Sequence, residues 1–200
     1  MGTGNKVLTL LPSSLGELTN LEELVLNKCK SLQALPPSIG NLSCLISLQM
    51  RECKCVIELP ESIGNCTSLI EVGLSKCVKL KELPVSIFKW TVLEDLILTK
   101  CKSLEHIPQS IAQCKSLVFL DCRGCKTLQT LPTSIGDLTN LRILDMANCK
   151  QLTHLPKSLG LLLQLERFDV SDCKSLEELP HAFETVRHIL VGWPVDKGEG

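Results

Sequence analysis

The chain has 200 residues and no tyrosine, and aromatic side chains make up only 3% of it. Proteins that bind single-stranded nucleic acid stack the bases on aromatic side chains, so this shortage argues against that class. The net charge is −1 and the pI is near 6.4, which gives the chain as a whole no attraction for polyanions. We therefore expect no nucleic-acid partner.

Long apolar runs and nucleotide-binding loops are also missing. No stretch approaches the roughly 18 consecutive apolar residues of a membrane span, and the N-terminus lacks the charged and apolar regions of a secretory signal. No Gly-x-x-x-x-Gly-Lys-Ser/Thr loop occurs. We expect no membrane partner, no cofactor, and a location in the cytoplasm or the nucleus.

What the chain does contain is a strict period. Cysteines recur every 24 residues, and a fixed period of this length is the signature of a stacked solenoid. The seven residues of this cysteine column are Cys29, Cys53, Cys77, Cys101, Cys125, Cys149 and Cys173.

Each period contains the same pattern of local structure. A stretch such as residues 23–27 alternates apolar and polar residues like a strand with one buried face. A Leu-Pro step then gives an extended turn, and a serine two residues after the proline, such as Ser38, can cap a short helical turn. This predicts an α/β solenoid with a parallel sheet on its concave face and short helical or 3-10 turns on its convex face. The predicted units are a partial repeat over 1–10, seven repeats over 11–178, and a degenerate repeat and tail over 179–200.

The cysteines are interpreted as reduced structural thiols. Neighbouring members of the column would lie one strand spacing apart with parallel side chains, which is poor disulfide geometry. Zinc is the competing interpretation of Cys53-x-Cys55 and Cys122-x-x-Cys125, but no second pair or nearby histidine completes either site. We predict no metal site, and we expect Cys44 and Cys55 to be the exposed thiols.

The sequence does not favour an enzyme. His106 and His154 share a column but stand two repeats apart, about 10 Å at the strand spacing. No nucleophile, base and orienting group converge in the repeat pattern. Function is therefore expected on the exposed faces, above all on the concave strand surface that solenoids use for binding.

Variable residues on the strands form the candidate binding site. Apolar anchors with a charged border are typical of a binding hot spot, although scattered surface hydrophobes are the alternative. Three stacked aspartates would repel one another, and either a basic partner or the nearby arginines and water would screen them. A column of lysines after the cysteines is interpreted as solvated rather than as a phosphate or RNA site. The predicted partner-binding residues are Ile97, Phe119, Asp121, Arg123, Ile143, Asp145, Arg167 and Asp169.

The repeated motif Leu-Pro-x-Ser-Ile-Gly-x-Leu-x-x-Leu-x-x-Leu-x-Leu-x-x-Cys-x-x-Leu resembles the plant cysteine-containing leucine-rich repeat. That version is found in intracellular nucleotide-binding immune receptors, the disease-resistance proteins. The resemblance implies a curved horseshoe and a protein-recognition module, namely the ligand-sensing or autoinhibitory part of such a receptor. The alternative is a stand-alone intracellular scaffold without catalytic activity. We expect a monomer whose protein partner is basic where it meets the aspartates.

Overall fold

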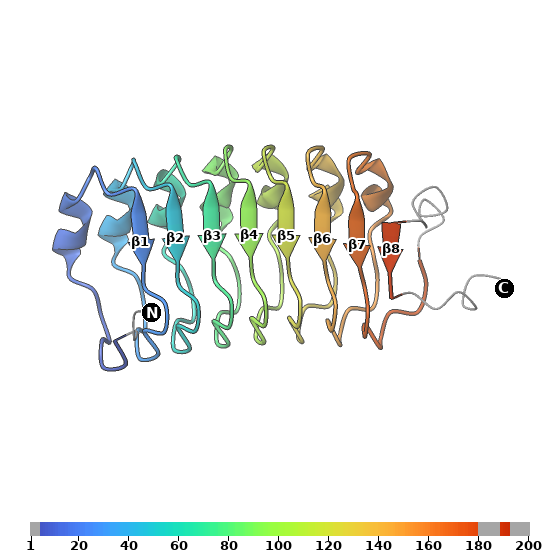
Figure 1. Cartoon of the computed structure of the whole chain (residues 1–200), viewed down its shortest axis with the longest axis horizontal. Helices are drawn as coiled ribbons and strands as arrows, with labels where there is room; N and C mark the ends of the chain where they lie inside the picture. Colours follow the sequence, from blue (N-terminus) through green and yellow to red (C-terminus); the bar gives the residue numbers. More distant parts are fainter. Residues whose placement is uncertain (1–4, 180–188, 193–200) are drawn as a thin grey trace.

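The computed structural model describes residues 5–179 and 189–192, and these residues build one parallel sheet. Strands follow one another in sequence order across the sheet, as Figure 1 shows. From β1 to β7 each residue pairs with the residue 24 positions later, so the sequence period becomes the sheet register, as in Glu23↔Ser47. The strands are β1 (Glu23–Val25), β2 (Ser47–Gln49), β3 (Glu71–Gly73), β4 (Asp95–Ile97), β5 (Phe119–Asp121), β6 (Ile143–Asp145), β7 (Arg167–Asp169) and β8 (Leu190–Val191).

Short 3-10 helices cover the other side of the solenoid (Figure 1). Each begins directly after the proline of a Leu-Pro step, or after Pro108 in the fifth repeat, where the chain reads Ile-Pro. The predicted parallel sheet and 3-10 turns are therefore confirmed. The helices are η1 (Ser13–Glu17), η2 (Pro37–Asn41), η3 (Glu61–Asn65), η4 (Val85–Lys89), η5 (Gln109–Gln113), η6 (Thr133–Asp137) and η7 (Lys157–Leu161).

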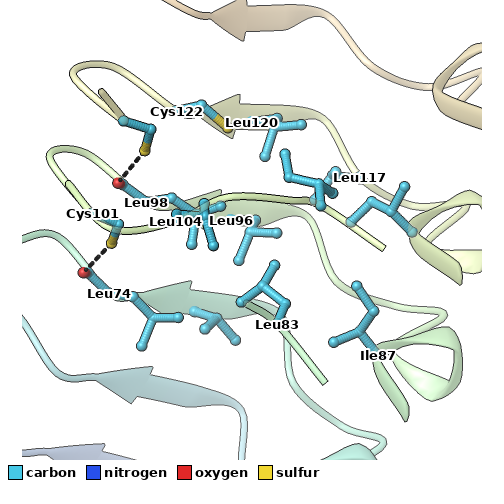
Figure 2. Close-up of a cluster of buried hydrophobic side chains, with 14 of the residues drawn as sticks. Leu74, Leu83, Ile87, Leu96, Leu98, Cys101, Leu104, Leu117, Leu120 and Cys122 are labelled. Carbon is cyan, nitrogen blue, oxygen red and sulfur yellow. Dashed lines mark hydrogen bonds between the residues drawn. The ribbon is translucent and has the colours of Figure 1, made fainter. Parts of the chain in front are cut away.

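The core lies between the sheet and the helices and is built from columns of equivalent residues. Leu96 and Leu120 on adjacent strands and Ile87 in η4 are fully buried, and Figure 2 shows them in one cluster of apolar side chains between the sheet and the helices. Because the same apolar residue returns every 24 positions, each repeat buries its leucines against the repeats on both sides. Replacing one such leucine by alanine is expected to cost about 2–5 kcal/mol.

The serines do not cap the helices, so that prediction was wrong. The N-cap position is occupied by a proline in extended conformation, with φ −67° and ψ 148° at Pro36. Ser38 is the second residue of the helix that follows. Ser134 and Ser158 instead donate to the carbonyls of Gln109 and Thr133 in the preceding helix, at 2.7 and 2.6 Å. Their hydroxyls therefore link neighbouring repeats rather than ending a helix.

Small residues allow the helices of successive repeats to approach closely. A Cβ added at Gly64 would lie 2.5 Å from the Cβ and the carbonyl oxygen of Ser86 in the next repeat. The fourth repeat replaces this glycine by Phe88, whose side chain lies at the surface. Trp90, two residues later, is fully buried and donates its indole N–H to the carbonyl of Ile63 at 3.1 Å. The Trp90 side chain thus satisfies a backbone group of the repeat before it.

Candidate binding surface on the concave sheet

The outward side chains of the strands form rows that run across the sheet. The register places Phe119 of β5 next to Ile143 of β6, and Ile143 next to Arg167 of β7. Phe119 and Ile143 are half-buried, and Arg167 is exposed. Ile97 of β4 is half-buried and lies diagonally across from Phe119, within reach of a large aromatic side chain. The three predicted apolar anchors are therefore brought together.

The three predicted aspartates also stack on adjacent strands, but they are not exposed. The register pairs Asp121 with Asp145 and Asp145 with Asp169, and only 2%, 6% and 6% of these residues remain accessible. They cannot offer free carboxylates to a partner. Their expected role in setting specificity for a basic partner must be corrected, because the chain itself occupies them.

Each aspartate accepts a hydrogen bond from the backbone N–H two residues later. This distance is 2.9 Å from Asp121 to Arg123, 3.0 Å from Asp145 to Ala147, and 2.9 Å from Asp169 to Ser171. Such a side-chain bond closes a local turn at the strand end. The aspartates therefore stabilise the turns that follow β5, β6 and β7.

Two arginines offset much of the negative charge of this stack. The Arg123 guanidinium donates to Asp121 at 2.8 Å and lies 3.5 Å from the Asp145 carboxylate, while Arg167 donates to Asp169 at 2.9 Å. Asp121 raises the pKa of Arg123 through this bond, against the opposing effect of burial. Of the two interpretations of the aspartates, screening by the protein's own arginines is the one that the geometry supports.

The carboxylates respond differently to these contacts. Burial raises the pKa of Asp145, and the Ala147 N–H and Arg123 offset only part of that effect. Burial alone would also raise the pKa of Asp169, but hydrogen bonds from Ser171 and the Arg167 guanidinium outweigh it and hold the pKa below 3.8. The stack thus contains one carboxyl that ionises less readily than usual and one that ionises more readily.

A second acidic pair, which the sequence analysis did not select, lies beside the apolar anchors. Glu71 of β3 and Asp95 of β4 are register neighbours, and Asp95 is the neighbour of Phe119. Both side chains are half-buried, and within residues 5–179 and 189–192 neither forms a hydrogen bond or an ion pair. Burial, Glu71 and Glu94 together raise the pKa of Asp95. The signal was present in the sequence, because both acids stand in the same outward column as Phe119.

The cysteine column lines the turns behind this surface. Its thiols are buried and free, and from Cys53 onward each donates to a carbonyl 27 residues earlier, as Cys101 does to Leu74 at 3.1 Å (Figure 2). Burial raises the pKa of Cys53 and Cys77 to about 12, and the neighbouring thiols add to this. Cys44 is exposed as predicted, whereas Cys55 is half-buried. No group of three or more potential metal ligands occurs in the described part of the chain.

Comparison with known proteins identifies the fold. The family model of the leucine-rich repeat matches residues 140–162. The leucine-rich-repeat domain of the type III effector XopL superposes with a TM-score of 0.70 at 23% identity, covering 92% of this chain and 73% of that domain. The fold is a leucine-rich-repeat solenoid. A structure of the Drosophila Toll–Spatzle complex is similar at a TM-score of 0.66 and 15% identity, covering 95% of this chain and 30% of that chain.

Receptor structures also resemble this leucine-rich-repeat solenoid. A chain in the structure of the Arabidopsis receptor kinase HAESA with the peptide hormone IDA and the co-receptor SERK1 is 28% identical, with a TM-score of 0.59. That match covers 82% of the present chain but 28% of that chain, so the solenoid spans less than a third of its length. A leucine-rich-repeat protein of Leptospira interrogans matches at 26% identity and a TM-score of 0.51, over 90% of this chain and 59% of that one. No curated protein sequence matches.

The fold indicates a module for protein–protein interaction. Its open parallel sheet presents extended rows of outward side chains, the kind of surface that solenoids use for binding. No helix within residues 5–179 and 189–192 is long and apolar enough to cross a bilayer.

Proposed function

We propose that this chain is a protein-recognition module whose concave sheet binds an extended segment of a partner protein. The observation that carries the proposal is the row of half-buried apolar side chains at the centre of the sheet, Phe119 and Ile143 with Ile97 beside them. Large apolar anchors at the centre of a polar surface carry most of the binding energy at protein interfaces. The unpaired acids Glu71 and Asp95 adjoin this row on one side, which favours a partner segment with a basic residue there.

We further propose that the chain serves as the ligand-sensing or autoinhibitory part of a protein like the plant intracellular immune receptors. The cysteine-containing repeat motif supports this origin, and the similarity to a solenoid chain in a hormone–receptor complex supports recognition of a peptide-like ligand. Twelve free cysteines favour a reducing compartment, the cytoplasm or the nucleus.

The test is quantitative affinity capture with two matched double variants. Phe119→Ala with Ile143→Ala truncates the concave anchors, whereas Val85→Ala with Leu163→Ala truncates two exposed apolar residues outside the sheet. A true partner should bind the concave variant at least about thirtyfold more weakly, since hot-spot truncations cost 2 kcal/mol or more. It should bind the control variant like the wild type. If the captured protein binds both variants equally well, the concave site is wrong.

A further inference from the structure

The turns that follow the strands carry an unusual concentration of positive charge. The seven turns contain 12 of the 21 lysines and arginines of the chain but only two of its 22 acids, Glu52 and Asp172. They carry ten more positive than negative side chains, and the rest of the chain carries eleven more negative than positive ones. The turns are residues 27–31, 51–55, 75–79, 99–103, 123–127, 147–151 and 171–175.

The fold gathers these turns on one edge of the solenoid. Strands in unbroken sequence order and register place each turn beside the preceding one along the lower edge in Figure 1. Adjacent turns are therefore about 5 Å apart, one strand spacing. The opposite edge differs, because the seven links from helix to strand, such as residues 114–118, contain two cations and three acids. We call the lower row of turns the basic edge.

The backbone presents these lysines in a fixed way. Lys28, Lys76 and Lys100 adopt the left-handed conformation, with φ between 60° and 63°, although glycine reaches this conformation more readily. Their N–H groups donate to carbonyls of the next repeat, as Lys76 does to Thr99 at 2.7 Å. The turns thus form a repeating, hydrogen-bonded backbone support for the lysine side chains.

Most of these cations have no internal partner. Lys76 pairs with Glu52 at 3.1 Å, and the two arginines contact acids, but the other nine lysines form no ion pair with any described residue. The nine are Lys28, Lys30, Lys54, Lys79, Lys100, Lys102, Lys126, Lys150 and Lys174. The net charge of −1 hides the separation of positive turns from the negative remainder of the chain. The expectation of no polyanion or membrane contact was based on that net charge.

We propose that the basic edge docks on an anionic lipid surface. The register holds all seven turns along one edge, so an extended anionic surface can meet several of them at once. The turns contain no aromatic residue on which bases could stack. Lysine predominates over arginine in the turns. Lysine attracts phosphate headgroups as a point charge and does not require the fixed bidentate geometry that arginine provides. Without an apolar wedge, the attachment is peripheral and reversible, and it leaves the concave sheet free.

The experiment uses vesicle co-sedimentation of the full chain. Wild-type protein should bind vesicles of phosphatidylcholine with about one third phosphatidylserine at about 0.1 M salt, and it should lose them at about 1 M. It should not bind pure phosphatidylcholine. Absence of binding to the anionic vesicles at low salt overturns the proposal.

Two triple variants with the same change in net charge separate the edge from the overall charge. The edge variant reverses the charge of one lysine in each of three adjacent turns, with Lys102→Glu, Lys126→Glu and Lys150→Glu. The control variant reverses the charge of three exposed lysines outside the turns, with Lys89→Glu, Lys115→Glu and Lys157→Glu. The edge variant is expected to lower the partition coefficient about a hundredfold or more, because each lysine near an anionic leaflet contributes about fivefold. The control should stay within a few-fold of the wild type.

Equal losses in the two variants would mean that the net charge, not the edge, attracts the lipid, and the proposal would be wrong. An oligothymidine probe provides the other arm. If the edge variant loses that probe while wild-type protein ignores the vesicles, the edge binds nucleic acid instead. Circular dichroism of both variants establishes that each is folded before the comparison is made.

Discussion

Two acidic rows lie on different strands of the concave sheet, one on β5 to β7 and one on β3 and β4, and they differ in their contacts. Asp121, Asp145 and Asp169 are buried, hydrogen-bonded to their own turns and in contact with two arginines. Glu71 and Asp95 are half-buried, adjoin each other and have no such partner among the described residues. The carboxylates of the first row stabilise the fold through internal contacts, whereas those of the second row are available to a group of another molecule. Acidity on a binding face is thus not by itself a sign of binding.

The largest expected effect is on stability, and it compares one residue from each row. Asp121→Ala removes bonds from the Arg123 N–H, the Arg123 guanidinium and the Thr99 hydroxyl, and it should lower the free energy of unfolding by about 3 kcal/mol. Asp95→Ala on the neighbouring strand removes no hydrogen bond and relieves repulsion with Glu71, so the change should stay within about 0.5 kcal/mol. Urea denaturation of the two variants measures the difference. Similar losses would contradict the distinction between the rows.

The dependence of stability on pH should also separate Asp169 of the first row from Asp95 of the second, with opposite signs. The pKa of Asp169 is below 3.8 in the folded protein, so its contribution is present above that value and is lost as the pH falls through the folded pKa. The pKa of Asp95 is raised above 3.8, so folding favours its protonated form and the ionised carboxylate lowers stability as the pH rises through the folded pKa.

The corresponding variants are Asp169→Asn and Asp95→Asn. The stability difference between wild type and Asp169→Asn should shrink as the pH falls below about 4, because the wild type loses the benefit of its carboxylate. The difference between wild type and Asp95→Asn should move in favour of the variant as the pH rises above about 4. Chemical denaturation at a series of pH values gives both curves. Parallel curves for the two variants would show that Asp169 and Asp95 titrate alike.

The repeat period was sufficient to predict the strands, their register and the buried columns, because a core residue such as Leu96 has an equivalent in every repeat. It could not predict the depth of Asp121, since alternation along a strand assigns a side chain to a face but not to a partner. The short side chain of Asp121 folds back onto the N–H of Arg123, a contact that depends on the turn conformation. Ser38 illustrates the same limit, because the proline before its helix already occupies the N-cap.

The basic edge was visible in the sequence only as a lysine column. Its significance depends on summing different positions of the turn, such as Arg51, Lys76 and Lys79, which the fold brings to one edge. The net charge of the whole sequence hides these cations, because the acids of the chain balance them in the total. The three-dimensional arrangement separates them, because the acids lie on other parts of the repeat.

The smallest expected effect concerns the cysteines, where the same contrast between bonded and free groups occurs within one turn. Cys53 is buried and donates to the Leu26 carbonyl at 3.1 Å, whereas Cys55, two residues later, is half-buried, and Cys44 is exposed. An aromatic disulfide that reacts with thiols should, at pH 8, label two of the 12 thiols quickly, with Cys44 reacting before Cys55. Cys53 should react only on unfolding, because burial raises its pKa to about 12 and leaves almost no thiolate.

The control is a variant with Cys44→Ser and Cys55→Ser, which should show no fast labelling while its denaturation curve stays close to that of the wild type. Fast labelling of a third thiol would mean that a turn opens under native conditions. Because the cysteines and the aspartates stabilise the same turns, such opening would also expose the aspartates. The aspartates would then be accessible to a partner for part of the time. Labelling confined to two sites instead makes the turns a rigid frame for both the concave sheet and the basic edge.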